Sequence, residues 1–294
     1  MSKKYFICSD VHSFFTILKK ALKKNGFDIN NQDHIFVLVG DLFDRGPESL
    51  ELYNWVRALP RERRILIRGN HEYLFRDMVK RGYAESHDYH NMTIDSLYQL
   101  NKWNDKEEVQ NFYKSLMFLK FDSPEYKQKE NYLSDGRQKC FQSKITKEII
   151  DWFASDEWVN YWETPRYIFT HGFIPLRQHI NFEKSLQYGY YIKDGDDEYR
   201  DDWRNATNTE WEDATWFNWK ENYQLVKNGL NRTGKYIVVG HWHTSDLYKF
   251  LDGTIKQVYD CPIYKSNTYK LIGLDACTAG SGKVNIMVLD REEL

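Results

Sequence analysis

The sequence has few cysteines, no long apolar run and almost no net charge. Its 4 cysteines among 294 residues show no C-x-x-C spacing, so a disulfide framework is excluded and free thiols are expected. No apolar stretch approaches the roughly 20 residues of a membrane-spanning helix, and the mean hydropathy is −0.73. The 41 Lys and Arg residues against 43 Asp and Glu give a net charge of −2, so there is no strong signal for a nucleic-acid partner.

The sequence also lacks an apolar leader, an internal repeat and a Pro-rich or Gly/Ser-rich linker. Its first residues, MSKKYFICSDVH, enter a strand-like run directly, so we expect a cytoplasmic protein with no membrane partner. Without a linker, residues 1–294 are expected to form one domain, with insertions at about 84–160 and 176–233.

Short apolar runs alternate with amphipathic stretches, which is typical of an α/β fold. Strands are expected at 5–8, 35–39, 65–67, 167–169, 236–239, 271–274 and 284–289. Apolar residues spaced as on one helical face follow the first strands and recur at 145–153 in the first insertion. The segment AGSGK (279–283) lacks the upstream glycine of a phosphate-binding loop, and we interpret it as a hairpin turn before the last strand.

Side chains that bind metal ions follow five of the expected strands directly. Because the carboxyl ends of strands in an open α/β sheet border one crevice, these residues are expected to converge. Carboxylate, amide and imidazole groups suit Mn²⁺, Fe or Zn²⁺, and two ions that share a carboxylate fit the number of ligands better than one. The seven candidates are Asp10, His12, Asp41, Asn70, His171, His241 and His243.

These residues lie in the blocks D-x-H, G-D, G-N-H-E, H and G-H-x-H, whose order resembles the calcineurin-like metallophosphoesterases. The segments GDLFDRG (40–46) and GNHE (69–72) more narrowly resemble phosphoprotein phosphatases, the PPP type of serine/threonine phosphatase, in a bacterial or phage-like form. The resemblance implies a metallophosphoesterase-type αββα sandwich, in which helices flank two central mixed β-sheets. It also implies a cofactor of two divalent metal ions, with Mn expected in vitro and Fe or Zn as alternatives.

The resemblance also implies a role for each ligand. Asp10 and His12 would bind the first metal, and Asp41 would bridge both. Asn70, His171 and His241 would bind the second metal. His243 matches a ligand of the first metal in the wider superfamily, although that position is outside the usual PPP set.

In the same family pattern, a metal-bridging hydroxide attacks the phosphate. His71 would act as the general acid with Asp44 as its orienting partner, and Arg45, Arg68 and Asn70 would bind the phosphate. The further substrate-binding arginine of PPP enzymes has no clear match.

Three functions follow from this pattern. The first is hydrolysis of phosphate monoesters, with phosphorylated serine or threonine in proteins as the main substrate and small phosphoesters besides. The second is a nucleotide or nucleic-acid-end phosphoesterase, because RGPESLELYNWV (45–56) also resembles diadenosine tetraphosphatases. The third is a non-catalytic metal-binding module. The aromatic residues of the second insertion suit either a substrate rim or a local core.

Overall fold

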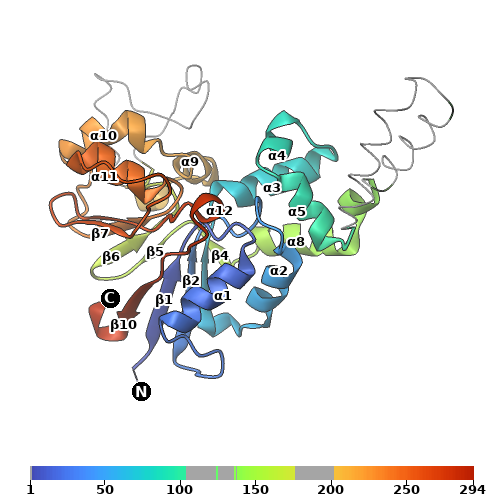
Figure 1. Ribbon diagram of the computed structural model, residues 1–294, viewed down its shortest axis with the longest axis horizontal. Helices are drawn as coiled ribbons and strands as arrows, with labels where there is room; N and C mark the ends of the chain where they lie inside the picture. Colours follow the sequence, from blue (N-terminus) through green and yellow to red (C-terminus); the bar gives the residue numbers. More distant parts are fainter. Residues whose placement is uncertain (1, 104–123, 125–135, 137, 176–201) are drawn as a thin grey trace.

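The computed structural model describes residues 2–103, 124, 136, 138–175 and 202–294 (Figure 1). The strands are β1 (Lys4–Cys8), β2 (His34–Val39), β3 (Arg64–Ile67), β4 (Trp158–Val159), β5 (Trp162–Glu163), β6 (Tyr167–Phe169), β7 (Tyr236–Val239), β8 (Tyr264–Ser266), β9 (Leu271–Gly273) and β10 (Met287–Asp290). The α-helices are α1 (Phe15–Lys24), α2 (Ser49–Ala58), α3 (Asn70–Arg81), α4 (Ser86–His90), α5 (Thr93–Leu100), α8 (Lys144–Ala154), α9 (Asn208–Ala214), α10 (Trp219–Lys227), α11 (Thr244–Asp252) and α12 (Thr278–Ser281). Much of the predicted first insertion and residues 176–201 of the second lie outside the described residues.

The strands form two five-stranded mixed sheets. The first sheet has the order β10-β1-β2-β3-β4, with β10 antiparallel to β1 and the other pairs parallel. The second has the order β5-β6-β7-β9-β8, with β6, β7 and β9 parallel and the two edge strands antiparallel. The parallel strands at the centre of both sheets carry their carboxyl ends to one edge of the molecule.

Three apolar cores arise because the central strands are buried on both faces. In β2, Phe36 and Leu38 face the helices, whereas Val37 and Val39 face the second sheet. The second sheet alternates in the same way, with Ile168 of β6 directed to its own covering helices. Helices α1, α2 and α8 cover the first sheet, and α10 and α11 cover the second (Figure 1). The predicted αββα sandwich is confirmed.

All of the expected strands are present, although the last begins at Met287 rather than at residue 284. The hairpin turn predicted at 279–283 is wrong. Part of this segment forms the short helix α12, and β9 and β10 belong to different sheets. A connection that crosses between two sheets cannot be a hairpin, because hairpin strands are hydrogen-bonded neighbours.

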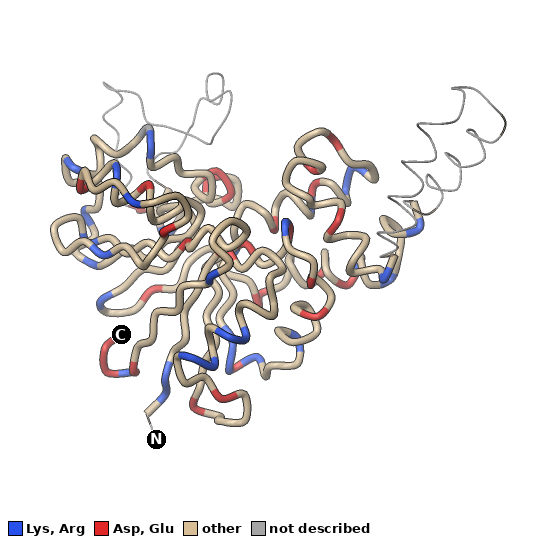
Figure 2. Tube along the Cα trace, in the orientation of Figure 1, with Lys and Arg blue, Asp and Glu red and all other residues tan. Residues whose placement is uncertain are grey.

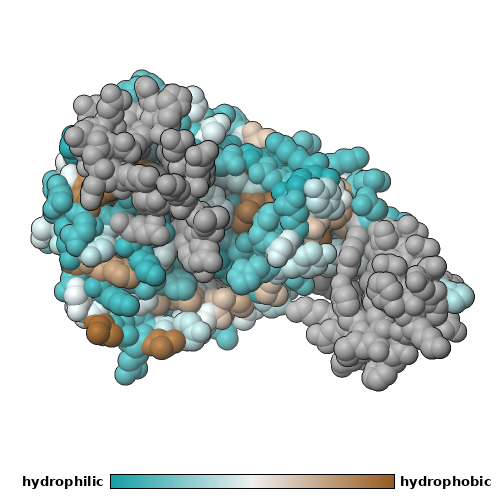
Figure 3. Space-filling view, turned by 90° about the horizontal axis from the view of Figure 1, so that it is seen from above, coloured by the Kyte–Doolittle hydropathy of each residue, from teal (hydrophilic) through white to brown (hydrophobic). Residues whose placement is uncertain are grey.

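The described part of the face seen in Figure 3 is mostly hydrophilic, and Lys and Arg residues are interspersed with Asp and Glu residues along the chain (Figure 2). Three of the large apolar side chains that are exposed, Ile255, Val258 and Tyr259, lie in the loop between α11 and β8. All four cysteines are buried and free, which confirms the expected thiols. None of the helices within the described ranges has the length and hydrophobicity that a membrane crossing requires.

Candidate metal centre

The candidate ligands lie just beyond the carboxyl ends of parallel strands in both sheets. Asp10 follows β1, Asp41 follows β2 and Asn70 begins α3 after β3, all on the first sheet. His171 and His241 follow β6 and β7 of the second sheet. The backbone N–H of His241 donates to both oxygens of the Asp10 carboxylate at 3.1 Å, so the two sets of loops are joined directly.

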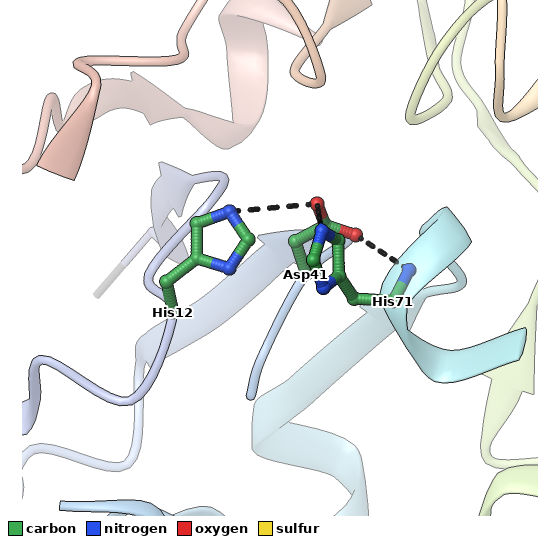
Figure 4. A group of neighbouring side chains, drawn as sticks. All are labelled: His12, Asp41 and His71. Carbon is green, nitrogen blue, oxygen red and sulfur yellow. Dashed lines mark hydrogen bonds and ion pairs between the residues drawn. The ribbon is translucent and has the colours of Figure 1, made fainter. Parts of the chain in front are cut away.

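The Asp41 carboxylate lies at the middle of the cluster. Its Oδ2 is 3.6 Å from His12 Nε2 and 3.8 Å from His71 Nε2. Its Oδ1 is 3.3 Å from His171 Nε2 and accepts the backbone N–H of His71 at 3.1 Å. Figure 4 shows this carboxylate between His12 and His71, which comes from the first turn of α3. Asp41 therefore lies between side chains from both sheets, which is where a carboxylate that bridges two ions would lie.

The donor atoms fit a divalent cation. His12 donates from Nδ1 to the Phe43 carbonyl and His171 donates from Nδ1 to the Val39 carbonyl, each at 2.9 Å. Nε2 is then the nitrogen of each ring that a metal ion can take, and both Nε2 atoms lie near the Asp41 carboxylate, at 3.6 Å for His12 and 3.3 Å for His171. A backbone carbonyl that fixes the other ring nitrogen is the usual arrangement of a metal-binding histidine.

Asn70 extends the donor set on the side of the second sheet. Its Oδ1 lies 2.9 Å from His171 Nε2 and 3.0 Å from His241 Nδ1. The buried groups His12, Asp41 and His71, and the buried groups Asp10, Asp41 and His171, each bring three ligand atoms within 4.8 Å of one another. These two groups share Asp41, which suits two ions.

The backbone at the cluster is held in an uncommon conformation. Positive φ angles at residues other than glycine are costly, and they concentrate at functional sites where the surroundings enforce them. Gly40 also has φ +81°, and a Cβ there would lie 2.2 Å from His171 Nδ1. The cluster residues with positive φ are Asp10, His12, Ser13, Asp41, Asp44, Arg45 and His241.

The charges of the cluster favour a cation. Burial acts to raise the pKa of Asp41, but the surrounding histidine rings hold it well below its ordinary value. Burial acts to lower the pKa of His171, but the carboxylates of Asp41 and Asp10 raise it to about 10. Burial, together with Asp275 and Asp41, raises the pKa of Asp10 well above its ordinary value. The same carboxylates that raise the pKa of His171 would also favour a bound cation.

The predicted acid and its partner lie beside this cluster. His71 Nδ1 is 2.6 Å from Asp44 Oδ2, and both side chains are buried. Arg45 extends Nη1 to His12 Nε2 at 2.9 Å and Nη2 to His71 Nε2 at 3.3 Å. The structure therefore brings His71, Asp44 and Arg45 together at the edge of the candidate metal centre.

Two other predicted residues have different surroundings. The Arg68 guanidinium donates to the carbonyls of Phe153 and Ser155 and to Asn160 Oδ1, each at 3.2 Å, so it links β3 to the segment after α8. His243 occupies the N-cap position of α11, and its side chain forms no hydrogen bond with the helix end or with the cluster among the described residues. The phosphate-binding role of Arg68 and the ligand role of His243 stay predictions.

Sequence reasoning gave no role to Glu72, although it belongs to the GNHE segment. Its buried carboxylate accepts the backbone N–H groups of Asp41 at 3.1 Å, Leu42 at 2.8 Å and Gly69 at 2.6 Å. Glu72 therefore ties the loop after β2 to the start of α3. This role could have been predicted from the position of Glu72 in the first turn of the expected helix, because a glutamate there accepts backbone N–H groups.

The aromatic residues of the second insertion divide into a core and one rim residue. Trp216 is half-buried, and its ring centroid lies 5.7 Å from that of His241. The turn that carries Trp216 is held to the segment after β6, because the Phe173 N–H donates to the Ala214 carbonyl at 3.1 Å. The side chains of the core are those of Trp203, Trp211, Phe217 and Trp219.

The sequence model of the calcineurin-like phosphoesterase family matches residues 3–245, which is most of the chain. The chain belongs to the calcineurin-like phosphoesterase family. The resemblance carried by the five sequence blocks is therefore confirmed. The buried His and Asp groups at the strand ends are consistent with a site for two divalent metal ions.

Curated relatives match shorter parts of the calcineurin-like domain. A serine/threonine-protein phosphatase 1 of Salmonella typhimurium is 41% identical over 73 residues, which cover 24% of this chain and 31% of that protein. A symmetrical bis(5'-nucleosyl)-tetraphosphatase of Hamiltonella defensa is 39% identical over 67 residues, 23% of each chain. The matches thus span less than a third of these relatives. Among solved structures, a protein-tyrosine phosphatase of a psychrophilic Shewanella has 14% identity and a TM-score of 0.45, with 99% of this chain and 76% of that chain covered.

Proposed function

We propose that this chain is a PPP-type protein serine/threonine phosphatase that also hydrolyses small phosphate monoesters. The observation that carries the proposal is the buried pair His71 and Asp44, 2.6 Å apart beside the Asp41 cluster. This pair supplies an oriented imidazole next to a site for two cations. It is the arrangement that protonation of a leaving oxygen requires. The Salmonella relative, a serine/threonine-protein phosphatase, supports the same substrate class.

Two divalent cations, when bound, would supply Lewis-acid activation of water and neutralise phosphate charge. Asp44 accepts the Nδ1 hydrogen of His71 and so directs Nε2 toward the side on which Arg45 lies. The transfer uses the imidazolium form of His71, whose Nδ1–H stays hydrogen-bonded to Asp44 while its Nε2–H proton passes to the oxygen of the departing serine or threonine. Arg45 presents a planar guanidinium at the same edge, which suits contact with two phosphate oxygens.

The test compares phosphate release from a phosphothreonine peptide, diadenosine tetraphosphate and a 3′-phosphorylated oligonucleotide. Metal-stripped protein is reloaded with Mn²⁺, Fe²⁺ or Zn²⁺ in parallel. His71→Asn is expected to lower turnover about a hundredfold or more, since a positioned acid contributes about that much. His90→Asn, at an exposed histidine on α4, is the matched control and is expected to change nothing. No release from the peptide by any loaded form would overturn the protein phosphatase proposal.

A nucleotide phosphoesterase is the second candidate, and Trp216 favours it. A partly exposed indole beside His241 offers a face on which a nucleobase can stack. Trp216→Leu is then expected to raise KM for diadenosine tetraphosphate more than KM for the peptide, whereas Trp216→Phe keeps a ring and retains more of the affinity. Equal effects on both substrates would assign Trp216 to packing.

The non-catalytic alternative predicts metal binding without turnover on all three substrates. Retention of His71, Asp44 and every candidate ligand supports the enzyme instead. The preference for Mn²⁺ and the cytoplasmic location stay predictions, which reconstitution and localisation of the tagged full chain test.

A further inference from the structure

Helix α5, in the first predicted insertion, carries a buried polar stripe beside a buried apolar one. Ile94, Leu97 and Leu100 pack into the core that covers the first sheet. Thr93, Ser96 and Gln99 are equally spaced along the helix and are at most 3% exposed. Buried polar side chains are costly unless they are hydrogen-bonded, so their partners show what the stripe does.

The polar stripe of α5 binds the loop that carries Asp44 and Arg45. Thr93 Oγ1 donates to Asp44 Oδ2 at 2.8 Å. The Asp44 backbone N–H donates to Ser96 Oγ at 2.9 Å. Gln99 binds the end of the loop, because its Nε2 donates to the Gly46 carbonyl at 3.0 Å and its Oε1 accepts the Ser49 N–H at 2.9 Å.

The loop needs this support because Asp44 and Arg45 both have positive φ angles, 77° and 62°. The contact of Thr93 is the most specific, since it reaches Oδ2, the same oxygen that lies 2.6 Å from His71 Nδ1. The other oxygen, Oδ1, is buried without a hydrogen-bond partner among the described residues. The hydroxyl of Thr93 therefore fixes which carboxylate oxygen faces His71.

We propose that Thr93 is a positioning residue for the acid His71 and acts through Asp44. The inference rests on the proposed phosphatase function and extends it to a helix in which the sequence shows no motif. Without the Thr93 hydroxyl, the Asp44 carboxylate rotates more freely and the His71 ring loses its fixed direction. Phosphate binding and metal binding do not involve Thr93, so both remain.

The test uses the dependence of the rate on the leaving group. Thr93→Val keeps the shape of the side chain and removes the hydroxyl, and Thr93→Ser restores a hydroxyl. A phosphoserine peptide has a poor leaving group that needs the acid, whereas p-nitrophenyl phosphate has a good one that needs it little. For Thr93→Val, kcat on the peptide is expected to fall about tenfold, with less than about a twofold change on p-nitrophenyl phosphate. KM and bound Mn²⁺ are expected to stay constant, and Thr93→Ser to recover most of the rate.

Thr146→Val is the matched control, because Thr146 on α8 is also fully buried and donates its hydroxyl to the Cys140 carbonyl away from the cluster. Ser96→Ala removes the second contact to Asp44 and is expected to show the same dependence on the leaving group. The ratio of the peptide rate to the p-nitrophenyl phosphate rate within one variant does not depend on the fraction of protein that is folded. A destabilised variant therefore still gives a result.

Equal loss on both substrates, or no recovery with Thr93→Ser, would overturn the positioning role while the phosphatase proposal stands. No phosphate release by the wild-type protein would overturn the phosphatase proposal and this inference with it. The positioning role is supported if the ratio of the peptide rate to the p-nitrophenyl phosphate rate falls in Thr93→Val and Ser96→Ala and stays unchanged in Thr146→Val.

Discussion

The Asp41 carboxylate lies between histidines from segments that follow strands of both sheets. Asp41→Asn removes the negative charge of this ligand, so we expect Mn²⁺ affinity to fall by about tenfold or more. Metal content after dialysis and calorimetric titration measure the effect. His71→Asn is expected to keep both ions while it lowers turnover, because His71 is assigned to proton transfer. Loss of an ion from His71→Asn would instead make His71 a ligand, a role its 3.8 Å distance from Asp41 also allows.

Gly40 provides a second test at the scale of one residue. An alanine Cβ at this position would meet His171 Nδ1 at 2.2 Å and the Gly69 Cα at 2.8 Å, with φ at +81°. Gly26→Ala is the matched control, since Gly26 has φ +87° and nothing within 4 Å of the added atom. We expect Gly26→Ala to lower the free energy of unfolding by about 1 kcal/mol and Gly40→Ala by roughly 3 kcal/mol or more. Equal losses in chemical denaturation would show that His171 moves away without cost.

Most of the candidate centre could be predicted from the sequence, because each ligand block follows a buried apolar run whose strand character is clear. The contacts of Arg68 could not be predicted, since its three acceptors lie in a segment more than 80 residues away. Thr93 was missed for a similar reason. The role that we propose for it depends on how α5 packs against the loop at Asp44, and no local pattern encodes that contact.

At the scale of elements, the strands that the sequence did not predict are short. β4 and β5 have 2 residues each and β8 has 3, too few for the alternation that identifies a strand. The predicted hairpin turn failed because the sequence does not show which sheet each strand joins. The long apolar runs of β1 and β2 were predictable because a strand buried on both faces needs apolar residues throughout.

Glu163 of the edge strand β5 forms ion pairs with two separate segments, at Arg204 and at Lys235 just before β7. Glu163 contacts Arg204 Nε at 2.7 Å and Lys235 Nζ at 2.8 Å. The hydrogen bond from Arg204, aided by Lys235, lowers the pKa of Glu163 to about 2. A carboxyl with a lowered folded-state pKa stabilises the fold above its ordinary pKa, and this contribution is lost as the pH falls toward 2.

Glu163→Gln is therefore expected to lower the free energy of unfolding at pH 7 by about 1 kcal/mol, the upper range for ion pairs open to water. The difference from the wild type is expected to shrink as the pH falls below about 4.5. Urea denaturation of both proteins between pH 7 and pH 3 measures this difference in the free energy of unfolding. A difference that stays constant over this range would mean that the charge of Glu163 contributes nothing, and that only its shape matters.

At the scale of the whole molecule, the candidate metal centre joins the two sheets. Asp10 and Asp41 belong to loops of the first sheet, and His171 and His241 belong to loops of the second. A cation held by both sets binds the folded chain in preference to the unfolded chain. At a free concentration of 100 times Kd, one such ion adds about 2.7 kcal/mol to the free energy of unfolding.

We therefore expect EDTA to lower the Tm by roughly 5 to 10 °C and Mn²⁺ to restore it. A single transition in both conditions would also support our proposal that residues 1–294 form one domain. His171→Ala removes a donor of the second sheet and should flatten the dependence of Tm on Mn²⁺, whereas His90→Ala should leave it unchanged. If calorimetry showed Mn²⁺ binding while the Tm stayed constant, the ion would lie away from the junction of the sheets. The cluster around Asp41 would then not be its site.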